Sequence, residues 1–273
     1  MKAAAFDYLK PKDVADAIKA LAGATGDAKA LGGGQSLGPM LNLRLARPKL
    51  IVDVSRLDAM RKIEDKGRAW RIGGAVTHAA IEDARLAGCE VLSDVARNIA
   101  YRAIRNRGTV GGSLAHADPS ADWPLALPAL DATVVISGPA GERSVPAGAF
   151  MKGAFTTVLT EDELVLAVEV PKLSAAARWG YWKFCRKTGE FPESSAAMLM
   201  DPERKLARLW VGALNGAPQP LERLAADIAL RGSLAATEQA VSAALELAAP
   251  DLDPVLRRLH ITAVRRAVQK GFG

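Results

Sequence analysis

Cysteine is scarce in this chain of 273 residues: only Cys89 and Cys185 occur, and they form no C-x-x-C pair. The three histidines, His78, His116 and His260, are equally scattered. A zinc site or an iron–sulfur cluster built from one chain needs several such ligands at short spacing. The sequence therefore predicts no metal site on this chain. The two cysteines are expected to be reduced and buried as small apolar residues.

Aromatic residues and long apolar runs are also few. Phe, Trp and Tyr together make up 5% of the chain, too few for an obvious platform on which nucleic acid bases stack. No apolar stretch approaches the roughly 20 residues of a membrane-spanning helix. The N-terminal segment Met1–Lys10 contains charge and no long apolar region, so it predicts no secretory signal. We therefore expect a cytoplasmic protein.

The net charge of +6 at pH 7 is spread along the chain, with Lys and Arg interleaved among Asp and Glu. This pattern favours a solvated surface with a few anion contacts over a nucleic-acid interface. The densest basic cluster consists of Arg97, Arg102, Arg105 and Arg107. Its position leaves two roles open for Arg105 and Arg107: to offset the charge of a cofactor or to bind a partner.

Glycine gathers in two places that we call the first and second cluster. The first cluster is the segment Leu31-Gly-Gly-Gly-Gln-Ser-Leu37, and the second is Thr109-Val-Gly-Gly-Ser113. Glycine tolerates left-handed conformations and has no Cβ, so such turns can bring bare backbone N–H groups together into a concave anion site. Two of these sites predict a clamp on a diphosphate, and hence a dinucleotide cofactor.

The pattern around the first cluster argues against the usual nicotinamide dinucleotide fold. The Rossmann fingerprint requires G-x-G-x-x-G between a strand and a helix. Gly32 and Gly34 fit the first two positions, but Leu37 stands at the third and Pro39 follows. Asp53 ends an apolar run where a ribose-binding carboxylate would lie, yet the missing glycine leads us to discount this interpretation.

Apolar periodicity and turn signals predict an α+β protein. We expect a first domain over residues 1–171, made of two α/β subdomains (about 1–56 and 57–171), and a C-terminal domain over 172–273. The C-terminal domain is expected to combine a three-stranded antiparallel sheet with a helical bundle. The expected helices span 14–23, 78–84, 92–104, 221–230, 234–248 and 253–268. The expected strands span 28–31, 50–54, 70–76, 133–137, 164–170, 178–184, 194–200 and 205–213.

Four motifs in fixed order carry a family resemblance. They are residues 32–36 (GGGQS), 105–113 (RNRGTVGGS), 117–122 (ADPSAD) and 183–191 (KFCRKTGEF). Together they resemble the FAD-binding medium subunit of molybdenum hydroxylases, the carbon monoxide dehydrogenase and xanthine dehydrogenase family. The resemblance covers essentially the whole chain, and it implies that the first domain, residues 1–171, is an FAD-binding domain.

The resemblance implies a set of FAD-binding residues. The first cluster would hold one half of the diphosphate, through Leu31, Gly32, Gly33, Gly34, Gln35, Ser36 and Leu37. The other half would be held by Thr109, Gly111, Gly112 and Ser113. The resemblance also places Asp122 against the sugar portion of FAD and Lys183 near the flavin, with His116 inside the second motif. Phe191 falls where related chains often have a tyrosine, so stacking is retained without the hydroxyl, and Gln35 replaces a common histidine.

Structural roles remain open for several of these residues. Asp122 precedes Trp123-Pro124 and is also suited to cap a helix, while Lys183 fits the solvated face of a strand. His116 fits a role in bracing its loop. His78 and His260 are interpreted as structural.

The resemblance also implies a division of labour. This chain would carry FAD but no catalytic acid or base and no metal. A large partner subunit would carry molybdopterin and a small one two [2Fe–2S] clusters, in a dimer of heterotrimers. Electrons would pass through FAD to a quinone, NAD or oxygen. Two alternatives remain: a self-contained FAD-dependent oxidase of the vanillyl-alcohol-oxidase type, and a basic module that binds polyanions. The substrate of the large subunit is left open.

Overall fold

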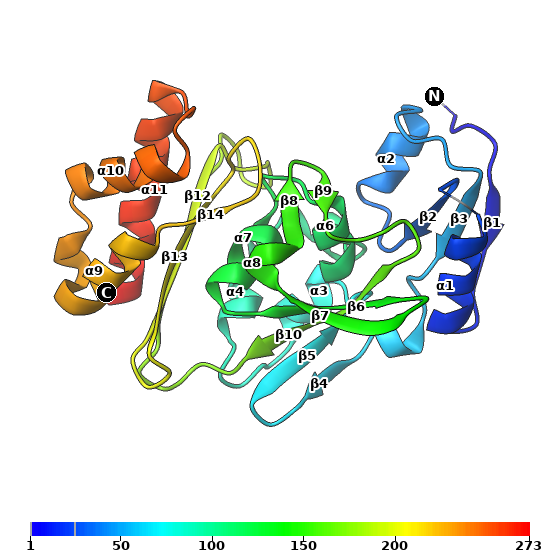
Figure 1. Cartoon of the computed structure of the whole chain (residues 1–273), viewed down its shortest axis with the longest axis horizontal. Helices are drawn as coiled ribbons and strands as arrows, with labels where there is room; N and C mark the ends of the chain where they lie inside the picture. The colour runs from blue at the N-terminus through cyan, green and yellow to red at the C-terminus, as the bar shows by residue number, and fades with distance from the viewer. Residues whose placement is uncertain (1, 25) are drawn as a thin grey trace.

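A computed structural model describes residues 2–24 and 26–273 of the chain. Met1, the first residue of the N-terminal segment discussed above, lies outside the described residues, as does Thr25. The three larger β-sheets follow one another along the long axis of the molecule, with helices between and beside them (Figure 1), and a fourth sheet has only the two strands β8 and β9. Mixed helix and antiparallel sheet confirm the expected α+β class. Within the described residues, no helix is long and apolar enough to cross a membrane.

The N-terminal sheet is parallel and has the order β1-β3-β2. Its strands are β1 (Asp7–Leu9), β2 (Ala28–Leu31) and β3 (Leu50–Asp53), and its helices are α1 (Val14–Gly23) and α2 (Leu37–Asn42). Asp13 caps α1, because its side chain accepts a hydrogen bond from the Asp16 N–H. The short elements β1 and α2 were not predicted.

The central sheet has five antiparallel strands in the order β4-β5-β10-β6-β7. The strands of this region are β4 (Ile63–Asp65), β5 (Ala69–Gly73), β6 (Thr133–Gly138), β7 (Gly141–Pro146), the hairpin β8 (Met151–Gly153) and β9 (Thr156–Thr157), and β10 (Leu164–Pro171). Its helices are η1 (Asp58–Met60), α3 (His78–Asp83), α4 (Val91–Arg97), α5 (Arg102–Arg105), α6 (Val110–His116), α7 (Asp122–Ala129) and α8 (Ala147–Phe150).

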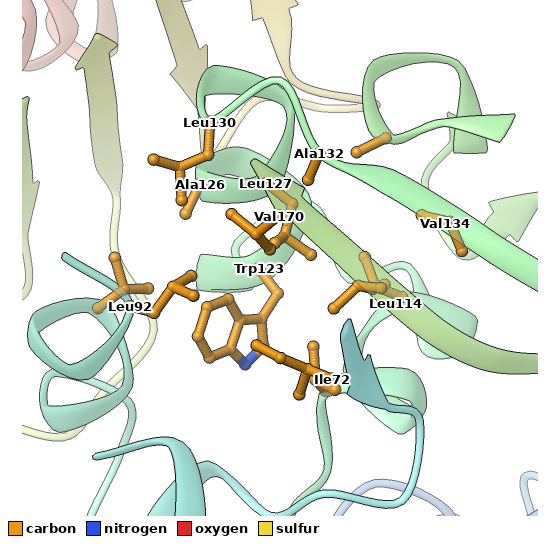
Figure 2. Close-up of a cluster of buried hydrophobic side chains, with 14 of the residues drawn as sticks. Ile72, Leu92, Leu114, Trp123, Ala126, Leu127, Leu130, Ala132, Val134 and Val170 are labelled. Atoms are coloured by element: carbon orange, nitrogen blue, oxygen red, sulfur yellow. The ribbon is translucent and has the colours of Figure 1, made fainter. Parts of the chain in front are cut away.

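Helix α7 forms the centre of the largest hydrophobic core. All eight of its residues are buried, and such a helix shows no polar face that periodicity could detect. Figure 2 shows the Trp123 ring with Leu92 on one side and Ile72 on the other. The mainly apolar segment 122–129, which contains two prolines and follows the second cluster, is therefore a buried helix. Cys89 is fully buried as expected, whereas Cys185 is only partly buried.

The expected helix over 92–104 is wrong, because the chain breaks it into α4 and α5. Ala100, between the two helices, has a φ of 43°, a left-handed conformation that an α-helix does not allow. The Arg105 guanidinium donates hydrogen bonds to the carbonyl oxygens of Ile99 (2.9 Å) and Ala100 (3.0 Å). The Arg105 side chain therefore stabilises the break between the two helices from several residues further along the chain. Local helix propensity does not predict such a contact.

The C-terminal region confirms the three expected antiparallel strands and adds a short fourth. They are β11 (Arg178–Phe184), β12 (Ser194–Asp201), β13 (Leu206–Gly212) and β14 (Gln219–Pro220), followed by α9 (Glu222–Arg231), η2 (Gly232–Ala235), α10 (Glu238–Ala248) and α11 (Pro254–Phe272). One sheet face packs on α11: a Cβ at Gly180 would lie 1.8 Å from the Ala267 carbonyl oxygen. The opposite face joins the central core through Tyr181, Ala197 and Trp210. Because residues alternate between faces, β11 connects both layers.

Candidate functional site

The first cluster forms the corner between β2 and α2, at the C-terminal end of a parallel strand. Leu31 is the last residue of β2 and Leu37 is the first of α2. Within residues 2–24 and 26–273, the backbone N–H groups of residues 32–37 donate no hydrogen bond. Six consecutive donors therefore remain available in one turn, with Gly34 in the left-handed region at a φ of 75°. Such an arrangement suits an anion.

In the second cluster, by contrast, the backbone N–H groups of residues 111–113 already donate hydrogen bonds within the protein. The Gly111 N–H donates to the Gly74 carbonyl oxygen (2.9 Å), and the Gly112 N–H donates to Thr109 Oγ1 (3.1 Å). The Ser113 N–H donates to the Thr109 carbonyl oxygen (2.9 Å). Thr109 is the N-cap of α6. The prediction that both clusters present bare N–H groups is therefore wrong for residues 111–113 of the second cluster, whose glycines allow close packing of a helix instead.

The two clusters adjoin each other. A Cβ built at Gly33 would lie 1.9 Å from the Arg107 carbonyl oxygen, a separation that real Cβ atoms do not reach. A Cβ built at Gly32 would lie 2.9 Å from Thr109 Oγ1. Only glycine at position 33 lets the backbone of the first cluster rest directly on the segment that leads into the second. The Thr109 hydroxyl therefore stands at the junction of the two clusters.

A buried histidine supports the second cluster from the other side. The His78 N–H donates to the Gly108 carbonyl oxygen (2.9 Å), and a Cβ at Gly108 would lie 2.8 Å from the His78 ring. Trp123 Nε1 donates to His78 Nδ1 (3.0 Å), which fixes the neutral tautomer with its proton on Nε2. Burial, reinforced by the positive charge of Arg105, lowers the pKa of His78 to about 4. His78 is therefore structural and uncharged at neutral pH, as the sequence analysis expected.

A second group of candidate residues meets at the start of α7. Lys183 Nζ lies 2.8 Å from Asp122 Oδ1 and also donates to the Asn98 carbonyl oxygen (2.8 Å). The Tyr181 hydroxyl donates to the same Oδ1 atom at 2.5 Å. Asp122 is the first residue of α7, so its side chain is held between this buried helix and strand β11. The structure brings Asp122 and Lys183 together, and excludes the interpretation of Lys183 as a purely solvated residue.

His116 and Phe191 lie apart from these contacts. The His116 ring packs against the Phe155 ring, with 5.2 Å between their centroids, at the C-terminal end of α6. Phe191 lies in the loop between β11 and β12 and is 64% exposed. The hydrogen bonds and ring contacts of the described residues join neither of them to the other candidate residues.

The structure also shows what Arg105, Arg107 and Asp53 contact. Arg105 is buried and pairs with Glu82 through Nε at 2.7 Å, so its role is structural. The Arg107 carbonyl oxygen packs closely against Gly33, while the Arg107 side chain is exposed to solvent. The Asp53 carboxylate accepts hydrogen bonds from the Tyr8 hydroxyl and the Ser55 N–H, which agrees with discounting it as a ribose ligand.

Sequence reasoning missed two residues that shape the site. The carbonyl oxygen of Gly74, the residue that follows β5, accepts the Gly111 N–H, and nothing in its local pattern indicates this partner. Tyr181 could have been found, because it stands two residues before Lys183 on an expected strand. Residues at this spacing lie on the same face of a strand.

Residues 4–173 match the model of the FAD binding domain in molybdopterin dehydrogenase.

Two relatives show similarity over most of the chain. The carbon monoxide dehydrogenase medium chain of Hydrogenophaga pseudoflava is 35% identical, over 91% of this chain and 88% of that protein. The 6-hydroxypseudooxynicotine dehydrogenase complex subunit alpha of Paenarthrobacter nicotinovorans is also 35% identical, over 98% and 91%. A chain of quinoline 2-oxidoreductase from Pseudomonas putida 86 superposes with a TM-score of 0.87 at 32% identity, over 99% of this chain and 98% of its own.

This chain belongs to the family of FAD-binding domains of molybdopterin dehydrogenases. It is an FAD-binding flavoprotein subunit of the molybdenum hydroxylase type, and the resemblance carried by the four motifs is confirmed.

Proposed function

We propose that this chain passes electrons from the [2Fe–2S] clusters of a small partner subunit, through its own FAD, to an external acceptor. A large molybdopterin subunit oxidises the substrate in this scheme. The relatives support a multi-subunit enzyme, since they are called a medium chain and a subunit of a complex. The proposal includes a dimer of heterotrimers in the cytoplasm and a quinone, NAD or oxygen as acceptor.

The proposal assigns FAD to residues 1–171 and treats 172–273 as a second domain that completes the site. The matched family range, which ends at residue 173, supports this boundary. Lys183 and Phe191 are the candidate cofactor residues that the second domain contributes. The first domain contributes both glycine clusters, His116 and Asp122.

The first cluster carries the proposal, because its donors fit the diphosphate of FAD. The N–H groups of residues 32–37 have no partner among the described residues, and uncompensated donors in one turn are what a phosphate group satisfies. Gln35 Nε2 donates to the Gly33 carbonyl oxygen (3.3 Å) and stabilises the same turn. Ser36 is exposed, with its hydroxyl also available to the cofactor.

The second cluster contributes hydroxyl groups rather than backbone donors. Thr109 Oγ1 accepts the Gly112 N–H, so its own proton remains to be donated to an anion. Ser113 lies one turn along α6 and offers a second hydroxyl. Gly111 and Gly112 then act by letting α6 approach β5 and the Thr109 side chain closely enough to present these groups.

Asp122 and Lys183 form the other end of the proposed site. Asp122 Oδ1 is occupied by Tyr181 and Lys183, while Oδ2 accepts no hydrogen bond from any described residue. We assign Oδ2 as the acceptor for a sugar hydroxyl of FAD. Lys183 supplies a positive charge at this end, and Phe191 an exposed aromatic ring. FAD, when bound, supplies the redox centre, and the protein positions and tunes it.

The proposal is tested by flavin retention in the purified full-length chain. The chain is incubated with FAD and desalted, and its absorption spectrum is recorded for the wild type and for Gly33→Ala. The added Cβ would overlap the Arg107 carbonyl oxygen and force the two clusters apart, so we expect Gly33→Ala to lose most of the bound flavin.

Gly216→Ala is the matched control, because a Cβ at Gly216 meets nothing within 4 Å. Thermal unfolding is followed in parallel to show that each variant is folded. A folded wild type that retains no flavin would contradict the proposal. A Gly33→Ala variant with full flavin content would remove the first cluster from the site.

A further inference from the structure

Tyr181 is a buried residue that the proposed electron transfer does not itself use. Its side chain is only slightly exposed, and its hydroxyl donates to Asp122 Oδ1 at 2.5 Å. Burial, together with the neighbouring Asp122 carboxylate, raises the pKa of Tyr181 well above its usual value of 10. The hydroxyl therefore remains protonated and acts as a permanent donor to Asp122.

The position of Tyr181 follows from strand alternation in β11. Gly180 and Trp182 face α11: a Cβ at Gly180 would meet Ala267, and Arg266 lies 4.8 Å from the Trp182 ring centroid. Tyr181 and Lys183 consequently face the opposite way, toward α7. Trp179 lies on the same face, and its ring stacks parallel to the Tyr181 ring with 6.3 Å between centroids. The Tyr181 ring is thus held by packing before its hydroxyl reaches Asp122.

The two donors to Asp122 converge on a single oxygen atom. Tyr181 and Lys183 both bind Oδ1, from adjacent positions on one face of β11. Two donors to one oxygen fix the rotation of the carboxylate and direct Oδ2 away from both of them. A buried carboxylate in one orientation binds a hydroxyl group with less loss of conformational freedom than a rotating one.

Lys183 alone would hold Asp122 less firmly. Its ammonium group is shared with the Asn98 carbonyl oxygen and sits on a flexible four-carbon side chain. The Tyr181 ring has two rotatable bonds and is packed, so it supplies the rigid member of the pair.

We propose that Tyr181 is a positioning residue for the cofactor, acting through Asp122 by holding its carboxylate so that Oδ2 faces the FAD sugar hydroxyls. This inference rests on the proposed role of Asp122 in FAD binding. Tyr181 itself makes no contact with the cofactor in this scheme. Its contribution exists only while Asp122 is present as the group it orients.

A double-mutant cycle on the full-length chain tests this dependence. The dissociation constant of FAD is measured by flavin fluorescence for the wild type, Tyr181→Phe, Asp122→Ala and the double variant, because alanine leaves no acceptor for the Tyr181 hydroxyl. Tyr181→Phe keeps the packed ring and removes the hydroxyl. With Asp122 in place, we expect Tyr181→Phe to raise the Kd roughly tenfold, which is the size of effect that losing one hydrogen bond to a charged group produces. In the Asp122→Ala background we expect Tyr181→Phe to change the Kd less than about twofold.

Tyr101→Phe is the matched control, because Tyr101 is 57% exposed and its hydroxyl has no hydrogen bond among the described residues. It is expected to leave the Kd unchanged, and thermal unfolding verifies that all variants are folded. A Tyr181→Phe effect of equal size in both backgrounds would overturn the proposal, because it would show a structural role independent of Asp122.

The remaining outcomes separate this inference from the proposed function. If Asp122→Ala weakens FAD binding but Tyr181→Phe does not, the positioning role is overturned and the role of Asp122 stands. If Asp122→Ala leaves the Kd unchanged, the assignment of Asp122 fails, and the positioning role fails with it. Tight flavin binding in that last case would still leave the diphosphate assignment of the first cluster intact.

Discussion

The buried His78 makes the stability of this protein depend on pH in a way that can be calculated. Its pKa is about 4 in the folded chain against 6.5 when exposed, chiefly because burial disfavours the charged imidazolium. Protonation would also set a second N–H against the Trp123 donor at Nδ1. Between pH 6.5 and 4 the unfolded chain therefore binds a proton that the folded chain does not.

The sign of the effect follows from this difference in proton binding. Stability rises with pH wherever the unfolded state binds more protons, so His78 lowers stability as the pH falls below 6.5. At pH 5 the two pKa values give a loss of about 2 kcal/mol, and below pH 4 the loss levels off at about 3 kcal/mol. Above pH 6.5 this contribution to the pH dependence vanishes.

Urea denaturation at pH 7 and pH 5 measures the loss, and His78→Asn isolates it. The asparagine amide oxygen can accept the Trp123 N–H in place of Nδ1, but asparagine does not titrate. We expect the variant to be less stable than the wild type at pH 7, because the smaller side chain packs less well. Between pH 7 and pH 5, however, it should lose about 2 kcal/mol less stability than the wild type loses. An identical pH dependence in both proteins would refute the reasoning, as would a His78 ring that titrates near pH 6.5 by NMR in the folded state.

Two ion pairs give further predictions. Arg105→Met leaves Glu82, whose side chain is only 12% exposed, without its main partner and should cost about 3 kcal/mol, whereas Arg102→Met on the exposed side of the same carboxylate should cost less than about 1 kcal/mol. Equal losses in urea denaturation would contradict this difference. The Arg143 guanidinium lowers the pKa of Glu163 to about 2, so the pair stabilises the folded chain above pH 4.5 and this contribution disappears as the pH falls to 2. The stability difference between wild type and Glu163→Gln should shrink over that window, and a difference that persists at pH 2 would be the contrary result.

Local signals in the sequence were sufficient for the elements that carry their own caps or alternation. Asp13 and Thr77 precede α1 and α3, and their side chains accept backbone N–H groups from the first turn of each helix. The strands β6, β10 and β11 read as continuous or alternating apolar runs. These patterns depend on residues within one element, so they can be interpreted without knowledge of the fold.

Elements that depend on distant partners were not predictable in this way. Strand β1 has three residues, and it exists because β3, more than 40 residues later, pairs with it. The break between α4 and α5 depends on Arg105 reaching back to two carbonyl groups. After Asp122, helix α7 contains only apolar residues and has no polar face, so the sequence shows no helical period there.

The two glycine clusters look alike in the sequence, yet they use glycine for different physical reasons. In the first, the N–H groups of residues 32–37 have no partner among the described residues. In the second, the N–H groups of Gly111 and Gly112 are already taken by Gly74 and Thr109, and glycine is needed for close packing. Part of this difference can be read from the sequence, because a threonine three residues before Gly112 fits an N-cap that consumes this N–H. The Gly74 partner cannot be read there. A glycine-rich turn therefore indicates an anion site only when the chain provides no cap for its N–H groups and no neighbouring strand to accept them.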